Sequence, residues 1–502
     1  MPRPGTTITT SAAAVSASPG EPLGTWLVAA ETQRGPLVPP DYSTPLRSIA
    51  DYTTLYGSRD ATLGSVVQTY DALDAFWRSG GQGVLIARVV GPAAVLSSKT
   101  LQDRATPTPV DTLKVAAKGP GAWGNSHLTV SVTDGVTTNT YVLTILVDTV
   151  AVETSPELVT PTDAVTWSTT SKYVTITDLA SATAAPGNRP AVVSAQSFAS
   201  GADDLASVTD THWTAALNTG FPTAVGPGLV SKIGVYTAAG HAGTVAHAAA
   251  NNRLALLDGV AGSSQATLTT LAGAVQGAAT TTSEYAMVFA PWLVVPPANT
   301  GTASRLIAPS AVAAGLISGQ VSAGSPNVAA AGDNGRAAWV LDVQTVFTAT
   351  ERDTLNGVSP VNVLRRPYPS SAAPAIELYG YNTLASIASG SSNSGWRQAT
   401  AQLLRLQLTH ELNLISEQFL FDQIDGRGQK IAEFKGAITG VMQEWKAGGS
   451  LADFRVDTDS VNTPTTIAAG ELHARVLLQI SPYAEFVIID VVKVPFNQPI
   501  AA

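Results

Sequence analysis

The stretch Leu63–Val90, LGSVVQTYDALDAFWRSGGQGVLIARVV, decides the fold class. In its first part the apolar side chains recur with a helical period, at Leu63, Val66, Val67, Tyr70, Leu73, Phe76 and Trp77. The glycines of Gly80–Gly83 end this helix, and Val84–Val90 then predicts a strand. Upstream, Thr25–Ala30 predicts a buried strand. A strand, a helix and a strand in this order predict a layered α/β unit.

The same α/β rhythm returns after Gly201. The predicted strands there are Ile233–Thr237, Leu254–Asp258 and Tyr285–Ala290, and the predicted helices between them are Gly240–Asn251 and Gln265–Gln276. Alternation of this kind implies a largely parallel sheet. We therefore expect the two α/β stretches to complete one core around the segment that separates them.

The separating segment, residues 97–200, is rich in threonine and in short strand patterns. Its predicted strands are Leu113–Ala117, Leu128–Val132, Tyr141–Val147 and Tyr173–Thr177. Within Leu128–Val132 the apolar residues alternate with Thr129 and Ser131, as in a half-buried strand of a small sandwich. The segment is predicted to be an inserted β domain.

The C-terminal part carries two amphipathic helices and two strands. Gly395–Phe421 has a helical apolar period, Asp425–Gly428 interrupts it, and a second helix follows as far as Trp445. Together they predict a helical hairpin. His473–Ile480 alternates and is predicted to form a linked pair with Phe486–Val494, whose two faces are both apolar and must both be covered.

The two ends of the chain read as extended arms. Met1–Pro22 is rich in Thr, Ser, Ala and Pro, with a β-prone run at Thr6–Thr10, and a short proline-rich tail follows Val494. Extended tails next to a strong sheet suit strand addition between subunits. The alternative is that both tails are disordered, as terminal segments commonly are.

The predicted fold is mixed α/β: a layered core, an inserted β-rich domain, a C-terminal helical hairpin with strands, and extended N- and C-terminal arms. The expected boundaries are residues 1–22 for the N-terminal arm, 23–96 and 201–394 for the two parts of the core, 97–200 for the insertion, 395–483 for the C-terminal domain, and 484–502 for the last strand and arm.

Composition excludes several classes of function. Charged residues make up 13% of the 502 residues, about half the usual share, and the net charge is -9, which gives no reason to expect nucleic-acid binding. Without cysteine there is no disulfide framework and no thiolate chemistry. We see no secretory signal and no apolar run long enough for a membrane span, so a soluble chain is expected.

Three motifs suggest chemistry, and each has a plainer explanation. Gly119–Gly124 has the spacing of a dinucleotide fingerprint, but the next predicted element, His127–Val132, is a strand, so no helix N-terminus would hold a pyrophosphate. His410–Leu414 is half of a zinc-protease motif, with leucine where the second histidine belongs. Asp203 and Asp204 could act as acid and base, although adjacent acids are usually a solvated turn or a helix start. We predict no enzyme, no cofactor and no metal site.

Several segments, taken in order, resemble one family. Gly24–Gly35 ends in an Arg-Gly-Pro turn, Ala117–Asn125 resembles an Ala-Lys-x-x-Gly-x-Trp-Gly-Asn turn, Ala308–Gly315 resembles a Pro-Pro-Ser-Gly-x-x-Ala-Gly segment, and Val361–Arg365 an Ile-Asn-x-x-Arg segment. These resemble the contractile tail-sheath proteins of myophages and related contractile injection machines. The chain departs from the family at Phe421–Ile424, where Phe-Glu-Pro-Asn is common, and at Val321, near where an Asp is common.

The resemblance implies a structural subunit. Such subunits polymerise as a helical array around an inner tube and contract without nucleotide hydrolysis, because the work comes from two packings of the same subunits. The implied partners are copies of the chain itself, the inner tail tube protein, and the baseplate and tail terminator proteins, with no direct nucleic acid and no membrane insertion. The implied location is the virion tail, assembled in the host cytoplasm. The alternatives are a bacterial contractile injection system, an α/β enzyme with its site in the core, and a non-contractile shell protein.

The resemblance also implies two sets of contact residues. In such sheaths the arms of neighbouring subunits add strands to a third subunit's sheet, which points to Thr6–Ser18 and Phe486–Val494. The predicted contact residues of the arms are Thr7, Ile8, Thr9, Phe486, Ile488, Val492 and Val494. Charged residues of the helical hairpin are expected to face the tube, and the candidates are Lys430, Lys435 and Lys446.

Overall fold

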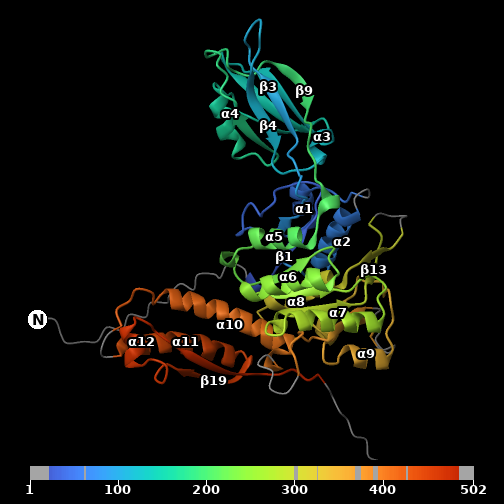
Figure 1. Ribbon diagram of the computed structural model, residues 1–502, viewed down its shortest axis with the longest axis vertical. Helices are drawn as coiled ribbons and strands as arrows, with labels where there is room; N and C mark the ends of the chain where they lie inside the picture. Colours follow the sequence, from blue (N-terminus) through green and yellow to red (C-terminus); the bar gives the residue numbers. More distant parts are fainter. Residues whose placement is uncertain are drawn as a thin grey trace, which may run out of the picture. The chain divides into compact units, whose positions relative to one another are not determined.

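The computed structural model describes residues 22–60, 64–298, 303–324, 326–367, 375–387, 394–424 and 428–485 (Figure 1). The chain divides into two compact units. The first unit comprises residues 1–326 and 330–410, and the second comprises residues 327–329 and 411–502. The division falls inside helix α10 (Ala399–Glu417). The predicted mixed α/β class is confirmed, and residues 1–21 and 486–502 of the two predicted arms lie outside the described residues.

The first unit is built on one eight-stranded sheet with the order β15-β18-β17-β12-β11-β10-β1-β2. Its strands are β1 (Thr25–Ala30), β2 (Gly83–Arg88), β10 (Leu229–Lys232), β11 (Leu254–Asp258), β12 (Ala286–Ala290), β15 (Arg336–Ala337), β17 (Val361–Arg365) and β18 (Ile376–Tyr379). All neighbours from β2 to β17 are parallel, and β18 and β15 close that edge in antiparallel pairings.

The sheet joins the two parts of the sequence that flank the insertion. Trp26 of β1 lies opposite Val84 of β2 on one side and opposite Leu229 of β10 on the other. Strand β1 is therefore central, between a strand that precedes the insertion and one that follows it. The predicted single core with a largely parallel sheet is confirmed.

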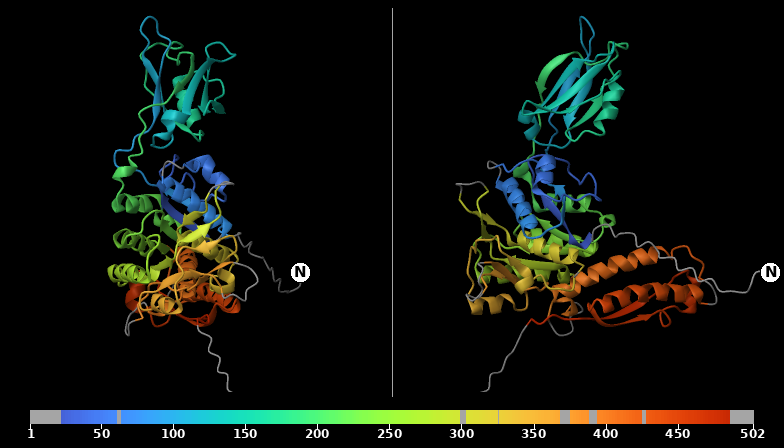
Figure 2. Two further views of the ribbon diagram at one scale, coloured as in Figure 1. Left: turned by 90° about the vertical axis from the view of Figure 1, so that its right-hand side faces the viewer. Right: turned by 180° about the vertical axis from the view of Figure 1, so that it is seen from behind.

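Helices cover both faces of this sheet (Figures 1 and 2). One face carries α5 (Asp210–Gly220), α6 (Ala238–Ala250), α7 (Gln265–Ala278) and α9 (Ala349–Leu355). The other face carries α1 (Ile49–Tyr56), α2 (Gly64–Arg78) and α8 (Pro309–Ser322). Strands such as β2 and β11 are buried along their whole length, as a parallel sheet covered on both faces requires. Buried Leu and Val side chains on each face contribute roughly 2 kcal/mol each.

The insertion is a β sandwich with a core of its own. One sheet holds β3 (Ser98–Gln102), β4 (Asp111–Ala117) and β8 (Val174–Asp178), and the other holds β5 (Leu128–Asp134), β6 (Tyr141–Val147), β7 (Val150–Thr154) and β9 (Val193–Ser197). Short helices α3 (Trp123–His127) and α4 (Pro161–Ser168) complete it. Side chains from both sheets, among them Val115 and Val130, share one buried cluster. An isolated antiparallel bridge between Val95 and Ala202 joins the two segments that connect the insertion to the core.

The second unit contains the last turns of α10, α11 (Gln429–Ala447), β19 (Leu451–Asp457), α12 (Pro464–Ala468) and β20 (Arg475–Ile480). Helices α10 and α11 run antiparallel, because Trp445 donates a hydrogen bond to Glu411 while Phe434 packs edge-on against Phe419, at 5.1 Å between ring centroids. The predicted helical hairpin is confirmed.

A small sheet of β13 (Leu293–Val295), β14 (Arg305–Ile307) and β16 (Asp342–Val343) belongs to the first unit.

The predicted strand Ile233–Thr237 is wrong. The strand here is β10, which ends at Lys232, and the following residues form the turn into α6. Gly234 adopts a left-handed φ of 101°, which breaks the extended path. Ile233 and Val235 are apolar because they are buried under that turn, so their pattern imitates a strand.

Strand β19 was not predicted, and the predicted pairing of the last described strand with Phe486–Val494 stays untested. Strand β20 pairs antiparallel with β19, whereas its expected partner, Phe486–Val494, lies outside the described residues. The register shifts between Leu451 and Asp453 of β19. A bulge changes the phase of the alternation, and so the period-two signal of β19 is weak in the sequence.

Candidate functional site

The glycine-rich turn Gly119–Gly124 lies between the insertion and the core, and it is no nucleotide loop. A Cβ atom on Gly119 would lie 1.9 Å from the carbonyl oxygen of Gly35, so the glycine allows two backbones to touch. A helix, α3, does follow the turn, contrary to the expectation that the next element is a strand. It is only five residues long, and the turn packs against protein where a pyrophosphate would need space.

Arg88, at the end of β2, holds this junction together. Its side chain is fully buried, and its Nη2 atom lies 2.7 Å from a carboxylate oxygen of Asp203, which follows the insertion. Its guanidinium also donates to the carbonyl oxygens of Thr32, Gly35 and Pro120. Burial lowers the pKa of Arg88, and the Asp203 carboxylate opposes this shift. One guanidinium therefore ties the core, the glycine-rich turn and the return strand together.

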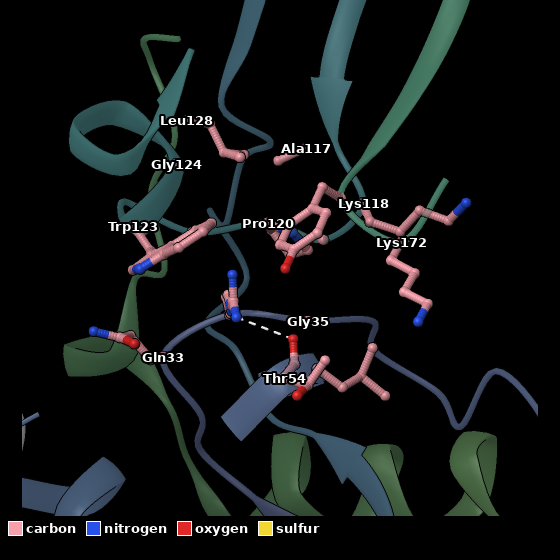
Figure 3. A pocket seen from close by; sticks show the side chains of 15 residues that line it. Gln33, Gly35, Thr54, Ala117, Lys118, Pro120, Trp123, Gly124, Leu128 and Lys172 are labelled. Carbon is pink, nitrogen blue, oxygen red and sulfur yellow. Dashed lines mark hydrogen bonds between the residues drawn. The ribbon is translucent and has the colours of Figure 1, made fainter. Parts of the chain in front are cut away.

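A second arginine of the core, Arg34, contacts aromatic side chains of the insertion at the same place; one of them, Trp123, is labelled in Figure 3. The guanidinium carbon of Arg34 lies 4.3 Å from the ring centroid of Trp123 and 5.3 Å from that of Tyr173. The dashed line in Figure 3 marks its hydrogen bond to the carbonyl oxygen of Thr54. The cavity beside it measures about 20 Å³, room for about one water molecule. The junction is a packed contact.

Asp203 and Asp204 do not form an acid–base pair. Asp203 bonds Arg88 and accepts a hydrogen bond from the backbone of Ala122, while Asp204 accepts from Ala93 and Ser207. Sequence reasoning missed Arg88 and Arg34. The available signal was an arginine inside the otherwise apolar run Val84–Val90, since a buried charge needs a partner.

The carboxyl ends of the parallel strands are where an α/β enzyme would hold its site. There, Asp258 of β11 accepts hydrogen bonds from the backbone and the hydroxyl of Ser310, in the first turn of α8. Burial raises the pKa of Asp258 to about 7. The Nε2 atom of His241 lies 2.8 Å from the backbone oxygen of Asp258, and so its hydrogen bond goes to the backbone and not to the carboxylate. This arrangement caps a buried helix; it does not activate the serine as a triad would.

The half zinc motif also has a structural role, since Glu411 accepts the hydrogen bond from the indole of Trp445. Within the described ranges no group of three or more His, Cys, Asp or Glu side chains could hold a metal ion. No helix in the described part of the chain is long and apolar enough to cross a membrane.

The three lysines expected to face a tube all have acidic partners inside the second unit. Lys430 pairs with Asp422 and Glu433, at 3.1 and 2.9 Å. Lys435 and Lys446 pair with Asp459 and Asp453, at 3.1 and 2.7 Å. These pairs are exposed, so each contributes little to stability, and they balance the lysine charges locally.

The second unit offers a surface for strand addition. Strands β19 and β20 form a sheet of two strands among the described residues, so each has one edge without a neighbouring strand there. Helix α11 packs on this sheet, while Leu477 of β20 is 51% exposed. An isolated two-stranded sheet is only marginally stable, and further strands would extend its ladder of hydrogen bonds. The predicted arm residues, Thr7, Ile8, Thr9, Phe486, Ile488, Val492 and Val494, lie outside the described residues.

Several solved structures have a fold similar to that of this chain. The crystal structure of a sheath tail protein from Listeria innocua is similar, with a TM-score of 0.61, 14% identity, and coverage of 91% of this chain and 95% of that one. A chain of the anti-feeding prophage baseplate matches with a TM-score of 0.55, 15% identity, and coverage of 98% and 99%.

A chain of the sheath complex of an extracellular contractile injection system, PVC, in its contracted state matches with a TM-score of 0.50, 14% identity and coverage of 98% of both chains. No family model and no curated protein matches the sequence. At this level of identity the comparisons show a shared fold. They cover the core, the insertion and the C-terminal part together.

Proposed function

We propose that this chain is the structural subunit of a contractile tail sheath, which polymerises as a helical array around an inner tube and drives that tube through a target envelope by contracting. The observation that carries the proposal is the likeness to sheath structures over nearly the whole length of both chains. A shared core alone would fit many functions, whereas a shared order of core, insertion and C-terminal unit is specific. The role is structural and needs no catalytic site.

The two-stranded sheet β19–β20 supports a mesh of exchanged strands. We propose that Thr6–Ser18 of one neighbour and Phe486–Val494 of another add to its edges. Backbone hydrogen bonds between the added strands and the sheet would link neighbouring subunits. The alternating apolar side chains of the C-terminal segment would fix the register of its pairing. Such a joint can swing without losing its partners, which suits a lattice that changes length.

Electron microscopy of the purified chain over a concentration series tests both statements. We expect hollow helical tubes from the full chain, and none from a chain that lacks Met1–Pro19, although both should melt at the same temperature. Tubes from the truncated chain would contradict the mesh alone. Small discrete particles from the full chain at every concentration would contradict self-assembly itself.

We further propose an inner tube protein as the partner of Lys430, Lys435 and Lys446. Reversing these lysines to glutamate would place like charges next to Asp422, Asp453 and Asp459, so lost docking could reflect local repulsion. Replacing all three by glutamine avoids this. Weaker tube docking with an unchanged melting temperature is expected, and unaltered docking would refute the role of the lysines.

The remaining partners and the location follow the same proposal: baseplate and tail terminator proteins at the ends of the array, and assembly in a host cytoplasm into a virion tail. The same fold occurs in an extracellular injection system, so a bacterial device is the second candidate. Purifying the assembled particles and testing them for packaged DNA separates the two, because only a phage tail joins a DNA-filled head.

A further inference from the structure

The tip of the helical hairpin exposes an apolar surface, formed by Leu414, Leu420 and Phe421 and called here the apolar tip. Their exposed fractions are 50%, 62% and 104%. Phe421 also adopts a left-handed φ of 66°. Bulky residues rarely adopt this backbone conformation, which costs roughly 1 kcal/mol or more. A strained turn that holds a phenyl ring fully in water indicates a contact that the described residues of the single chain do not make.

Acidic side chains surround the apolar tip. Glu417 and Asp422 flank it in sequence, and Glu433 of α11 lies across Lys430 from Asp422. Lys430 is the cation that pairs with both Asp422 and Glu433. Among the described residues of the tip, three carboxylates stand against one ammonium, so this surface carries negative charge. Its partner surface should therefore be an apolar hollow with a positive rim.

The chain carries such a hollow in its first unit. A cavity of about 80 Å³ has an apolar floor and an arginine rim, and is called here the arginine-rimmed pocket. The floor is made by the buried side chains of Val343, Phe347, Val363 and Leu364, and the rim by Arg352, Arg365 and Arg366. Val346, which is 75% exposed, lies at the mouth.

The rim keeps a surplus of positive charge. Arg365 pairs with Glu377 and Arg366 pairs with Asp342, at 3.1 and 2.6 Å. Arg352 donates to the carbonyl oxygen of Phe347, and within the described residues it has no carboxylate within 4 Å. Arg352 is therefore the rim arginine without an ion pair among the described residues, and an incoming acidic rim would find it available.

We propose that the apolar tip of one copy docks into the arginine-rimmed pocket of the next copy. The two surfaces match in polarity and in sign of charge, and they belong to different parts of the molecule. A contact between two different patches is head-to-tail and repeats without closing, which generates a helical array. This inference rests on the proposed function, since it names one contact of that array.

Cysteine crosslinking tests the contact directly, because the chain has no cysteine. The full-length variants Leu420→Cys, which keeps the ring of Phe421, and Val346→Cys, one of them with a size tag, are mixed and oxidised. We expect a disulfide-linked heterodimer on non-reducing gels. The matched control pairs Leu420→Cys with Val136→Cys, which is 101% exposed on the insertion, and should give only background.

Microscopy of the same mixtures separates the two proposals. Tubes without the heterodimer would overturn the docking contact and leave the sheath proposal standing. The heterodimer without tubes would support the contact and count against the array. If the mixtures give no tubes and no heterodimer, both proposals are overturned.

Further variants separate a lost contact from misfolding. Phe421→Asn removes the ring and suits the left-handed turn, so its melting temperature should hold or rise while the concentration needed for assembly rises about tenfold. Asp422→Lys and Arg366→Glu should each weaken assembly, and each also puts a like charge next to its partner in the same chain, Lys430 or Asp342. The double variant keeps these two local repulsions but restores opposite charges across the contact, so it should assemble better than either single variant. If the double variant assembles no better than the single variants, the charge match is refuted.

Discussion

At the scale of single residues, Arg88 illustrates how a buried charge organises a junction. The side chain is fully buried and bonds Asp203 together with three carbonyl oxygens from two segments. Removing one partner of a buried pair leaves the other charge without compensation, which costs about 3 kcal/mol.

The variant Arg88→Met should therefore lower the melting temperature and expose the connecting strands near Val95 and Ala202 to proteases. The double variant Arg88→Met/Asp203→Asn removes both charges and should recover part of the loss. Denaturant melts and limited proteolysis measure both effects. Wild-type behaviour of Arg88→Met would contradict the role of this residue.

His241 makes stability depend on pH. Burial lowers the pKa of His241 to about 4. The charge of Lys232 adds to this shift, and the hydrogen bond to the Asp258 backbone and the charge of Asp210 oppose it. An unfolded histidine titrates near 6.5, so between these values the unfolded chain binds a proton that the folded chain does not. Stability then falls as pH is lowered from about 6.5 to 4, by up to about 3 kcal/mol.

Asp258 changes the pH dependence of stability in the opposite direction. Its pKa is raised to about 7, so between about pH 4 and 7 the folded chain holds a proton that the unfolded chain has lost. The free energy of unfolding therefore falls as pH rises from about 4 to 7. The variant His241→Gln keeps a donor for the Asp258 carbonyl and cannot titrate. Its melting temperature should fall less than that of the wild type between pH 6.5 and 4.5. Parallel curves for the two proteins would refute the assignment.

At the scale of elements, α8 shows how closely two helices approach. A Cβ atom on Gly315 would lie 2.4 Å from the carbonyl oxygen of Phe76 in α2, whereas one on Gly319 would lie 3.4 Å from its nearest neighbour, the oxygen of Gly80. The two glycines share one helix and one face, so they form a matched pair.

Gly315→Ala should destabilise the chain by about 2 kcal/mol, because neither backbone can yield without moving a helix. Gly319→Ala should be neutral or stabilising by up to about 1 kcal/mol through helix propensity. Thermal melts of the two variants compare them directly. Equal effects would show that α2 and α8 are not in fixed contact at Gly315.

At the scale of the whole molecule, the insertion is expected to fold alone. Its two sheets share a buried cluster, and its ends meet at the bridge between Val95 and Ala202. Residues 95–202, which include this bridge, should melt cooperatively when expressed separately. The complementary chain, closed by a short glycine linker, should keep its parallel sheet. A separately expressed insertion without a melting transition would show that Arg34 and Arg88 are needed for its fold.

The sequence by itself determined the elements whose signal is local. The helical period of Leu63–Trp77 became α2 and the alternation of Leu128–Val132 became β5, because periodicity depends only on which face of an element is buried. The α/β rhythm determined the layered class for the same reason. The two helices of the hairpin followed from their apolar steps.

Only the tertiary structure decided which elements meet. Arg88 and Asp203 are 115 residues apart, β1 finds β2 and β10 on either side, and β20 pairs with a bulged strand whose pattern is faint. The arginine-rimmed pocket likewise combines residues of β16, α9, β17 and the segment between them. Pairing, charge compensation and cavity shape depend on packing between distant segments, which no local pattern encodes.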